Sequence, residues 1–392
     1  MDRPLLNRRL AAFGTTIFAE MSALAQRTGS INLGQGFPDA DGPEEVREAA
    51  VRALRDGRGN QYPPGPGIPE LRTAVATHQE RFYGRLGLSY DPDTEVLVTA
   101  GATEALAASL LALLEPGDEV VALEPYYDSY AAGIAMAGGR RVPVTLRPSA
   151  ETGAYHLDLD EFRDALTDNT RLILLNTPHN PTGTVLSRDE LSAIAALAVE
   201  RDLLVVADEV YEHLVFKGEH LPIASFPGMR ERTVTIGSAG KTFSFTGWKV
   251  GWVTAAPELI SAVRSAKQFL TYVSAGPFQY AVAEALALPD AYFTGLRDDL
   301  RAKRDILATG LADAGFGVFR PAGTYFITTD IRPLGETDGF AFCRALPERA
   351  GVVAIPNAVF YDHQDQGAPF VRFAFCKGTA VLQEAAGRLK RL

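Results

Sequence analysis

A lysine in a loop of small residues is the first feature of this sequence that could do covalent chemistry. Lys241 lies in the segment 238–242, Ser-Ala-Gly-Lys-Thr, directly after an apolar run at residues 233–237. A buried lysine readily shifts its pKa, and its neutral amine can form a Schiff base with a carbonyl group. The ordinary alternative is a surface lysine, but a Gly- and Ser-rich loop at a strand end is an unusual place for one. We therefore expect Lys241 to be a reactive amine.

Three further polar side chains follow apolar runs in the same way. Asp208 comes directly after residues 203–207, and Tyr211 lies three positions further on. An ionised aspartate at the end of a buried strand is costly without a cationic partner, so the alternative for Asp208 is a structural ion pair. Asn180 lies in a turn made rigid by two prolines and a glycine, where a purely structural role is equally compatible with the sequence. Together these residues offer a carboxylate, a phenol and an amide.

Two other runs end in residues suited to an anion and to a planar ring. After residues 95–99, Gly101, Ala102 and Thr103 open a helical segment. Small residues let the backbone approach a ligand, and a helix N-terminus favours an anion, although a plain turn has the same composition. After residues 119–123 come Tyr126 and Tyr127, either of which could stack on a ring or simply cover a rim.

The elements that position these residues follow a regular alternation. Short β-rich runs lie at residues 95–99, 119–123, 141–146, 171–176, 203–207, 233–237 and 250–254, with helical segments such as 103–114 and 188–200 between them. Strands alternating with helices predict an α/β fold with a mainly parallel sheet of seven strands. Ligands of such sheets bind beyond the carboxyl ends of the strands, which is where the candidate residues lie.

The chain divides into three predicted parts. Residues 1–44 form an N-terminal arm and part of a small domain, residues 45–288 form the large domain, and residues 289–392 complete the small domain. A charged helix near 292–314 and short strands near 325–328 and 371–375 predict an α+β arrangement for the last part.

Composition excludes several classes of protein. The 392 residues carry a formal net charge of −10, which argues against a nucleic-acid partner. Cys343 and Cys376 are expected to be free thiols, and no metal site is predicted. The first residues lack the apolar core of a signal peptide, and no apolar stretch reaches the roughly 20 residues that span a bilayer. We expect a cytoplasmic protein without a membrane partner.

A phosphate-binding loop of the nucleotide hydrolases is also excluded. Gly240, Lys241 and Thr242 match the end of that motif, but the position five residues before Gly240 must be glycine and is Thr235. The combined set of lysine, carboxylate, amide, phenol, stacking aromatic and anion cradle instead fits pyridoxal 5'-phosphate (PLP).

At this point the sequence resembles the class I/II aminotransferases of PLP fold type I over nearly the whole chain. The resemblance lies in the order and spacing of residues 180–183 (NPTG), 208–211 (DEVY) and 238–243 (SAGKTF). Within that family, segments 32–39, 60–62 and 246–252 look like the branch of kynurenine/glutamine and methionine aminotransferases and actinobacterial N-succinyldiaminopimelate aminotransferases. Segments 62–67 and 211–216 look most like the last group.

The resemblance implies a role for each candidate residue. Lys241 binds the cofactor covalently and later moves the substrate proton, Asp208 pairs with the pyridinium nitrogen, Asn180 and Tyr211 hydrogen-bond the phenolate oxygen, and Tyr127 stacks on the ring, with Tyr126 as a weaker candidate. The phosphate is held by Gly101, Ala102, Thr103, Ser238 and Lys249, and by Tyr62 of a neighbouring subunit, so that a homodimer is implied. Arg372 clamps the substrate carboxylate, with Gly36, Asn180 and Phe18 around the substrate.

The implied reaction moves an amino group from an L-amino acid to a 2-oxo acid. No second arginine for a distal carboxylate is identifiable, and Phe18, Tyr126 and Phe278 could make the pocket apolar, which favours aromatic, methionine-like or glutamine-like donors beside N-succinyl-LL-diaminopimelate. A PLP-dependent β-lyase acting on cysteine S-conjugates shares every cofactor residue and is the main alternative. A non-catalytic PLP-binding regulator is disfavoured, because such proteins carry an added DNA-binding domain for which we expect no room.

Overall fold

The central element is a seven-stranded sheet. The structure is a computed structural model, and it describes residues 5–14, 16–149 and 151–392. The strand order is β2-β10-β9-β8-β7-β3-β4, and all neighbours are parallel except β10, which runs antiparallel to β2 and β9. The strands are β2 (Val96–Thr99), β3 (Glu119–Glu124), β4 (Arg140–Thr145), β7 (Thr170–Asn176), β8 (Leu204–Asp208), β9 (Thr233–Ser238) and β10 (Gly251–Thr254). All seven predicted strands and the mainly parallel sheet are thereby confirmed.

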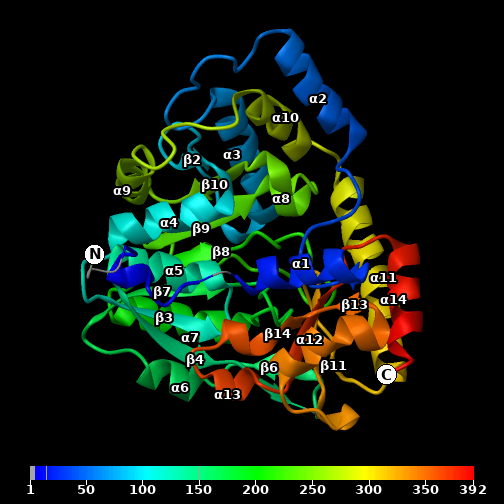
Figure 1. Cartoon of the computed structure of the whole chain (residues 1–392). Coiled ribbons are helices and arrows are strands. Elements are labelled where there is room, and N and C mark those ends of the chain that lie inside the picture. The colour runs from blue at the N-terminus through cyan, green and yellow to red at the C-terminus, as the bar shows by residue number, and fades with distance from the viewer. Residues whose placement is uncertain (1–4, 15, 150) are drawn as a thin grey trace.

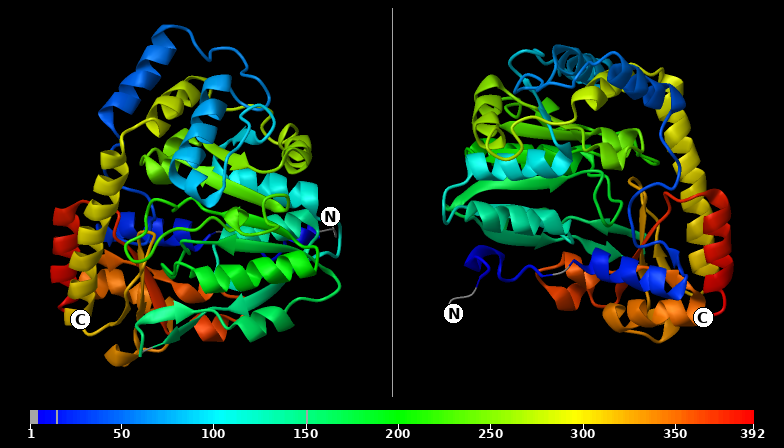
Figure 2. Two further views of the ribbon diagram at one scale, coloured as in Figure 1. Left: turned by 180° about the vertical axis from the view of Figure 1, so that it is seen from behind. Right: turned by 45° about the horizontal axis from the view of Figure 1, so that its top comes forward.

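Helices cover both faces of this sheet, as Figures 1 and 2 show from opposite sides. Because side chains alternate along a strand, Leu172 and Leu174 pack on one face with residues of α4 (Gly101–Leu113) and α5 (Asp128–Ala137). Ile173 and Leu175 pack on the other face with residues of α6 (Leu159–Asp164) and α7 (Arg188–Glu200). Burial on both faces explains why these strands are apolar throughout.

A second, four-stranded antiparallel sheet lies in the C-terminal part. Its order is β11-β12-β15-β14, with β11 at Gly317–Phe319, β12 at Phe326–Asp330, β15 at Phe370–Ala374 and β14 at Ile355–Pro356. The short strand β1 (Ile31–Asn32) pairs in parallel with β13 (Val352–Val353), so the N-terminal segment joins the C-terminal part. This pairing fits the predicted three-part division, whose boundaries themselves stay a prediction.

The remaining helices surround these sheets. They are α1 (Ile17–Thr28), α2 (Glu44–Arg55), α3 (Pro69–Tyr83), α8 (Ala239–Thr242), α9 (Pro257–Lys267), α10 (Gly276–Leu286), α11 (Asp290–Asp313), α12 (Gly339–Ala350), α13 (Gln364–Gly367) and α14 (Thr379–Leu389), and a two-stranded sheet pairs β5 (Arg147–Ser149) with β6 (Ala154–His156). Within the predicted N-terminal arm, Thr16 caps helix α1 and Gly29 ends it in a left-handed conformation. Among the described residues, no helix combines the length and apolarity needed to cross a membrane.

Candidate active site

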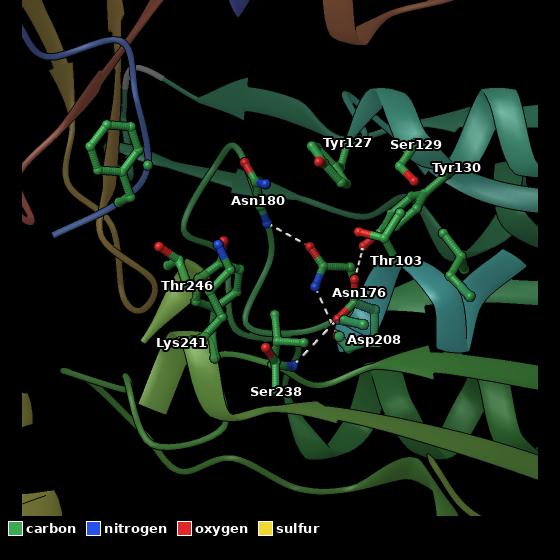
Figure 3. Close-up of a pocket in the computed structure, with 18 of the residues that line it drawn as sticks. Thr103, Tyr127, Ser129, Tyr130, Asn176, Asn180, Asp208, Ser238, Lys241 and Thr246 are labelled. Atoms are coloured by element: carbon green, nitrogen blue, oxygen red, sulfur yellow. Dashed lines mark hydrogen bonds between the residues drawn. The ribbon is translucent and has the colours of Figure 1, made fainter. Parts of the chain in front are cut away.

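The candidate residues meet in a cavity of about 390 Å³ at the carboxyl ends of the parallel strands. Figure 3 shows several of them converging from different elements. Thirteen predicted residues line the cavity: Phe18, Gly36, Gly101, Ala102, Thr103, Tyr127, Asn180, Asp208, Tyr211, Ser238, Lys241, Lys249 and Arg372. The fold therefore brings together groups that are up to hundreds of residues apart in the sequence.

Lys241 reaches the cavity from the short helix α8, directly after β9. Its Nζ donates a hydrogen bond of 2.9 Å to the hydroxyl of Tyr325, which in turn donates one of 2.6 Å to the carbonyl oxygen of Gly36. Burial is the main cause that lowers the pKa of Lys241 to about 8, against the opposing influence of Cys376 and Asp208. A lowered pKa leaves a larger neutral fraction near pH 7 than an ordinary lysine has, and the neutral amine can act as a nucleophile or a base.

Asp208 is the last residue of β8 and is buried. Its Oδ2 accepts a hydrogen bond of 2.6 Å from the hydroxyl of Tyr130, and its Oδ1 accepts a longer one of 3.4 Å from the amide of Val210. Burial raises the pKa of Asp208, while these hydrogen bonds and the charge of Lys241 act in the opposite direction. Among the described residues Asp208 forms no ion pair, so its carboxylate remains available to a cation in the cavity.

The turn that carries Asn180 is fixed by the strand beside Asp208. Asn176 donates from Nδ2 to the carbonyl oxygen of Asp208 at 2.8 Å and accepts at Oδ1 from the amide of Asn180 at 2.7 Å. Figure 3 shows this pair of hydrogen bonds between the two strand ends. The backbone of Asn180 is thus fixed, and Asn180 lines the same cavity as Asp208.

Arg372 lies in β15 and is 1% exposed, although it is charged. Its Nη1 donates to Oδ1 of Asn180 and its Nη2 to the carbonyl oxygen of Gly34, both at 3.0 Å, and its Nε has no partner among the described residues. The guanidinium carbon lies 4.0 Å from the ring centre of Phe326 and 5.3 Å from that of Phe18. Burial lowers the pKa of Arg372 to about 10. A buried cation with an unpaired donor is suited to a carboxylate ligand.

An anion cradle forms where α4 begins. Gly101 opens this helix with φ +74°, a left-handed conformation that favours glycine. A Cβ at Gly101 would lie 3.4 Å from Nζ of Lys249, and one at Gly251 would lie 2.7 Å from the carbonyl carbon of Gly101. The close approach of these backbones places the lysine ammonium beside the N-terminus of a helix, where an anion is stabilised. Ser238, at the end of β9, lines the same cavity.

Tyr62 was predicted to contact the phosphate, but it does not line this cavity. Its side chain is 80% exposed, and its ring meets that of Tyr272 edge to face at 5.5 Å. Within a single chain it cannot contact a ligand of the cavity, whereas a neighbouring subunit could receive it.

Tyr126 and Phe278 were expected to line the pocket, and that expectation is wrong, because neither residue lines the cavity. The Tyr126 hydroxyl donates to Asp362 at 2.6 Å, and Phe278 stacks on Trp248 with ring centres 4.7 Å apart. Of the consecutive residues Tyr126 and Tyr127, only Tyr127 lines the cavity, while the hydroxyl of Tyr126 is held by Asp362.

Several lining residues escaped the sequence analysis: Gln35, Ser129, Tyr130, Asn176, Tyr325 through its contact with Lys241, and Phe326. Tyr130 lies three residues after Tyr127 in α5, and Asn176 is the last residue of β7, so helical spacing and the strand-end rule could have identified both. Tyr325 precedes a strand of the other sheet, and nothing local in the sequence connects it with Lys241.

Comparison with known proteins agrees with this geometry. Residues 28–389 match the family described as Aminotransferase class I and II. The chain is 53% identical to Probable N-succinyldiaminopimelate aminotransferase DapC of Mycobacterium tuberculosis, covering 98% of each chain, and 39% identical to methionine aminotransferase of Escherichia coli, covering 100% of each. The solved structure of N-succinyldiaminopimelate aminotransferase from Mycobacterium tuberculosis superposes with a TM-score of 0.95 at 54% identity, covering 98% of this chain and 99% of that one. The chain belongs to the class I and II aminotransferase family, with the type I fold of that family and its amino-group transfer between amino acids and 2-oxo acids.

Proposed function

We propose that this aminotransferase uses PLP and that its physiological amino donor is N-succinyl-LL-diaminopimelate. The observation that carries the PLP assignment is the placement of Lys241 and Asp208 in one cavity, without an ion pair between them among the described residues. Two buried groups of opposite charge normally pair. Their separation leaves room for a ligand with a carbonyl group for the amine and a cationic nitrogen for the carboxylate.

The residues present fit that group in three further respects. The cradle of Gly101 and Lys249 would hold a phosphate, because it combines a helix N-terminus with an ammonium group. Tyr127 lines the cavity as a half-buried aromatic that could stack on a pyridine ring. The unpaired Nε of Arg372 leaves a buried donor for the substrate carboxylate.

Bound PLP supplies an electron sink that stabilises negative charge at the substrate Cα. The residues of this chain bind and orient the reactants. The Lys241 amine, with its pKa lowered to about 8, would take the proton from the substrate Cα and deliver it to the cofactor carbon on the other side of the amino nitrogen. Asp208 holds a proton on the ring nitrogen, Asn180 and Tyr211 fix the ring oxygen, and Arg372 orients the substrate by its carboxylate.

The proposed donor rests on the relatives. A relative that is 53% identical over nearly the whole chain is named for N-succinyldiaminopimelate, whereas the methionine aminotransferase is 39% identical. Aromatic, methionine-type and glutamine-type donors are the alternatives. Phe18 and Phe326, which flank Arg372, would contact such side chains close to the carboxylate clamp.

We also propose a homodimer in which Tyr62 reaches the phosphate of the neighbouring subunit. Tyr62, Phe269 and Tyr272 are 80%, 84% and 51% exposed, and the rings of Tyr62 and Tyr272 touch. Exposed apolar groups of this kind favour a protein interface. Sedimentation velocity of the wild type and of Tyr62→Phe would separate loss of the phosphate contact from loss of the dimer.

The test is a visible absorption spectrum of the purified protein, followed by titration with single amino acids, including N-succinyl-LL-diaminopimelate. Loss of the band of the lysine-linked cofactor together with release of an oxo acid supports transamination and ranks the donors. Pyruvate and ammonia released from a cysteine S-conjugate, with no transamination, would favour the β-lyase. Absence of the band after PLP is added would overturn the assignment of Lys241.

A further inference from the structure

Three side chains with metal-binding atoms meet outside the cavity. Glu212 and His213 follow Tyr211 in the chain, and they approach His78, which projects from α3. The Nε2 atoms of His78 and His213 are 2.8 Å apart, and Nε2 of His213 is 3.8 Å from Oε1 of Glu212. One ligand atom from each residue lies within 4.8 Å of the other two. The sequence analysis predicted no metal site, and these two histidines lie 135 residues apart in the chain.

We propose that His78, Glu212 and His213 bind a zinc ion. A donor set of two imidazole nitrogens and one carboxylate oxygen favours zinc over magnesium or calcium, which take oxygen ligands. With bonds of about 2.0–2.1 Å, neighbouring ligand atoms of a tetrahedral ion are roughly 3.3 Å apart. The two histidine nitrogens must therefore separate slightly and the carboxylate must approach, which small side-chain rotations achieve without moving the backbone.

The outer atoms of His78 and Glu212 are already held as metal ligands require. Nδ1 of His78 lies 3.3 Å from the carbonyl oxygen of Leu286, which can only accept, so Nδ1 carries the proton and the Nε2 lone pair faces His213. A ligating histidine commonly donates its other ring N–H to a carbonyl group in this way. Oε2 of Glu212 accepts from the Tyr83 hydroxyl at 2.8 Å and from Gln79 at 3.5 Å, which leaves Oε1 for an ion.

The surroundings would hold a bound ion in place. The ring of Phe82 lies 4.7 Å from each imidazole, and the ring of Phe293 lies 4.6 Å from that of His213, measured between ring centres. The imidazoles are consequently limited to small rotations, so little side-chain freedom is lost when an ion binds.

A second buried carboxylate lies behind the first. Glu209 bonds to His220 at 2.9 Å through Oε2, while its Oε1 has no partner among the described residues. The ring of His220 lies 5.7 Å from that of Tyr83, the residue that donates to Glu212. Because Glu209 already faces His220, Glu212 supplies the negative charge at the three ligands.

An ion here would join α3 to the segment that carries Asp208 and Tyr211. The alternative to a metal site is a histidine pair that only shares a hydrogen bond. Such a pair has no need of the Glu212 carboxylate oxygen beside it. Zinc binding is therefore expected to raise stability while leaving the shape of the cavity unchanged, because none of the three ligands lines it.

The experiment uses the full-length protein without a histidine tag, stripped with a chelator and titrated with Zn²⁺ by calorimetry. Co²⁺, followed through its visible ligand-field bands, reports the geometry. Wild type should bind one ion per chain and melt at a higher temperature with Zn²⁺. His213→Gln and the near-isosteric Glu212→Gln should lose both effects.

His156→Gln is the matched control, because His156 is exposed and distant in sequence from the three ligands. It should bind and melt like the wild type. Circular dichroism and a cooperative melting curve verify that each variant is folded. Absence of stoichiometric binding to the wild type, or binding retained in both ligand variants, overturns the proposal.

Discussion

The two sides of residues 208–213 use similar side chains in opposite ways. Asp208 and Tyr211 face a cavity of about 390 Å³, where buried charges stand apart from one another. Glu212 and His213 face α3, where polar atoms contact each other directly and aromatic rings pack around them. An open arrangement of buried charge is stable only with a ligand, whereas a closed one contributes to the fold itself. Substitutions on the cavity side should therefore change turnover, and those on the α3 side should change stability.

The largest effect on the cavity side is expected for Lys241→Ala. This variant removes both the covalent attachment and the base, so turnover should fall by at least about 10³-fold. Steady-state oxo-acid release measures the loss, and cofactor retained after gel filtration should show that PLP still binds noncovalently. Wild-type turnover in this variant would contradict the assigned role of Lys241.

Arg372→Ala should have the next largest effect. Loss of the buried carboxylate clamp is expected to raise KM about 30-fold or more, equivalent to roughly 2 kcal/mol. Arg372→Lys, which keeps the charge but not the forked geometry, should recover only part of this loss. Unchanged KM values in both variants would place the clamp elsewhere.

A third prediction concerns pH. The amine of Lys241 is protonated below its pKa of about 8 and reactive above it. In cofactor-free protein, the rate at which PLP is captured covalently should rise about tenfold per pH unit below pH 8 and then level off. Stopped-flow absorbance measures this profile. Tyr325→Phe removes the hydroxyl that accepts from Lys241, so it should shift the profile, while a pH-independent rate would refute the lowered pKa.

The smallest effect on turnover is expected on the α3 side. Tyr83→Phe removes the hydroxyl that donates to Glu212, so the free energy of unfolding should fall by about 1–3 kcal/mol. Because Tyr83 does not line the cavity, kcat should stay within about twofold of the wild type. Denaturant unfolding and steady-state kinetics on the same preparation test the contrast. A large loss of kcat without loss of stability would erase the distinction between the two sides.

The strand pattern predicted those cavity residues that directly follow a strand, because local signals mark them in the sequence. An apolar run followed by a polar residue located Asp208, Asn180 and Lys241, and parallel pairing then placed their strand ends at one edge. The family resemblance supplied Arg372, whose strand lies in the other sheet.

Contacts between segments far apart in the chain could not be predicted from the sequence. The contact of Lys241 with Tyr325 joins two sheets, and that of His78 with His213 joins a helix to a loop. Side-chain direction is a second property that the sequence does not determine. Composition could not tell which of the adjacent residues Tyr126 and Tyr127 faces the cavity. Only the direction of the backbone at the end of β3 decides between them.

Arg372 connects three stretches of chain, because it extends from β15 to the carbonyl oxygen of Gly34 and the side chain of Asn180. A carboxylate bound at Arg372 would contact a side chain that also holds the backbone at Gly34 in place. Any influence of that ligand on the N-terminal segment would have to act equally in the other direction, with the same free energy.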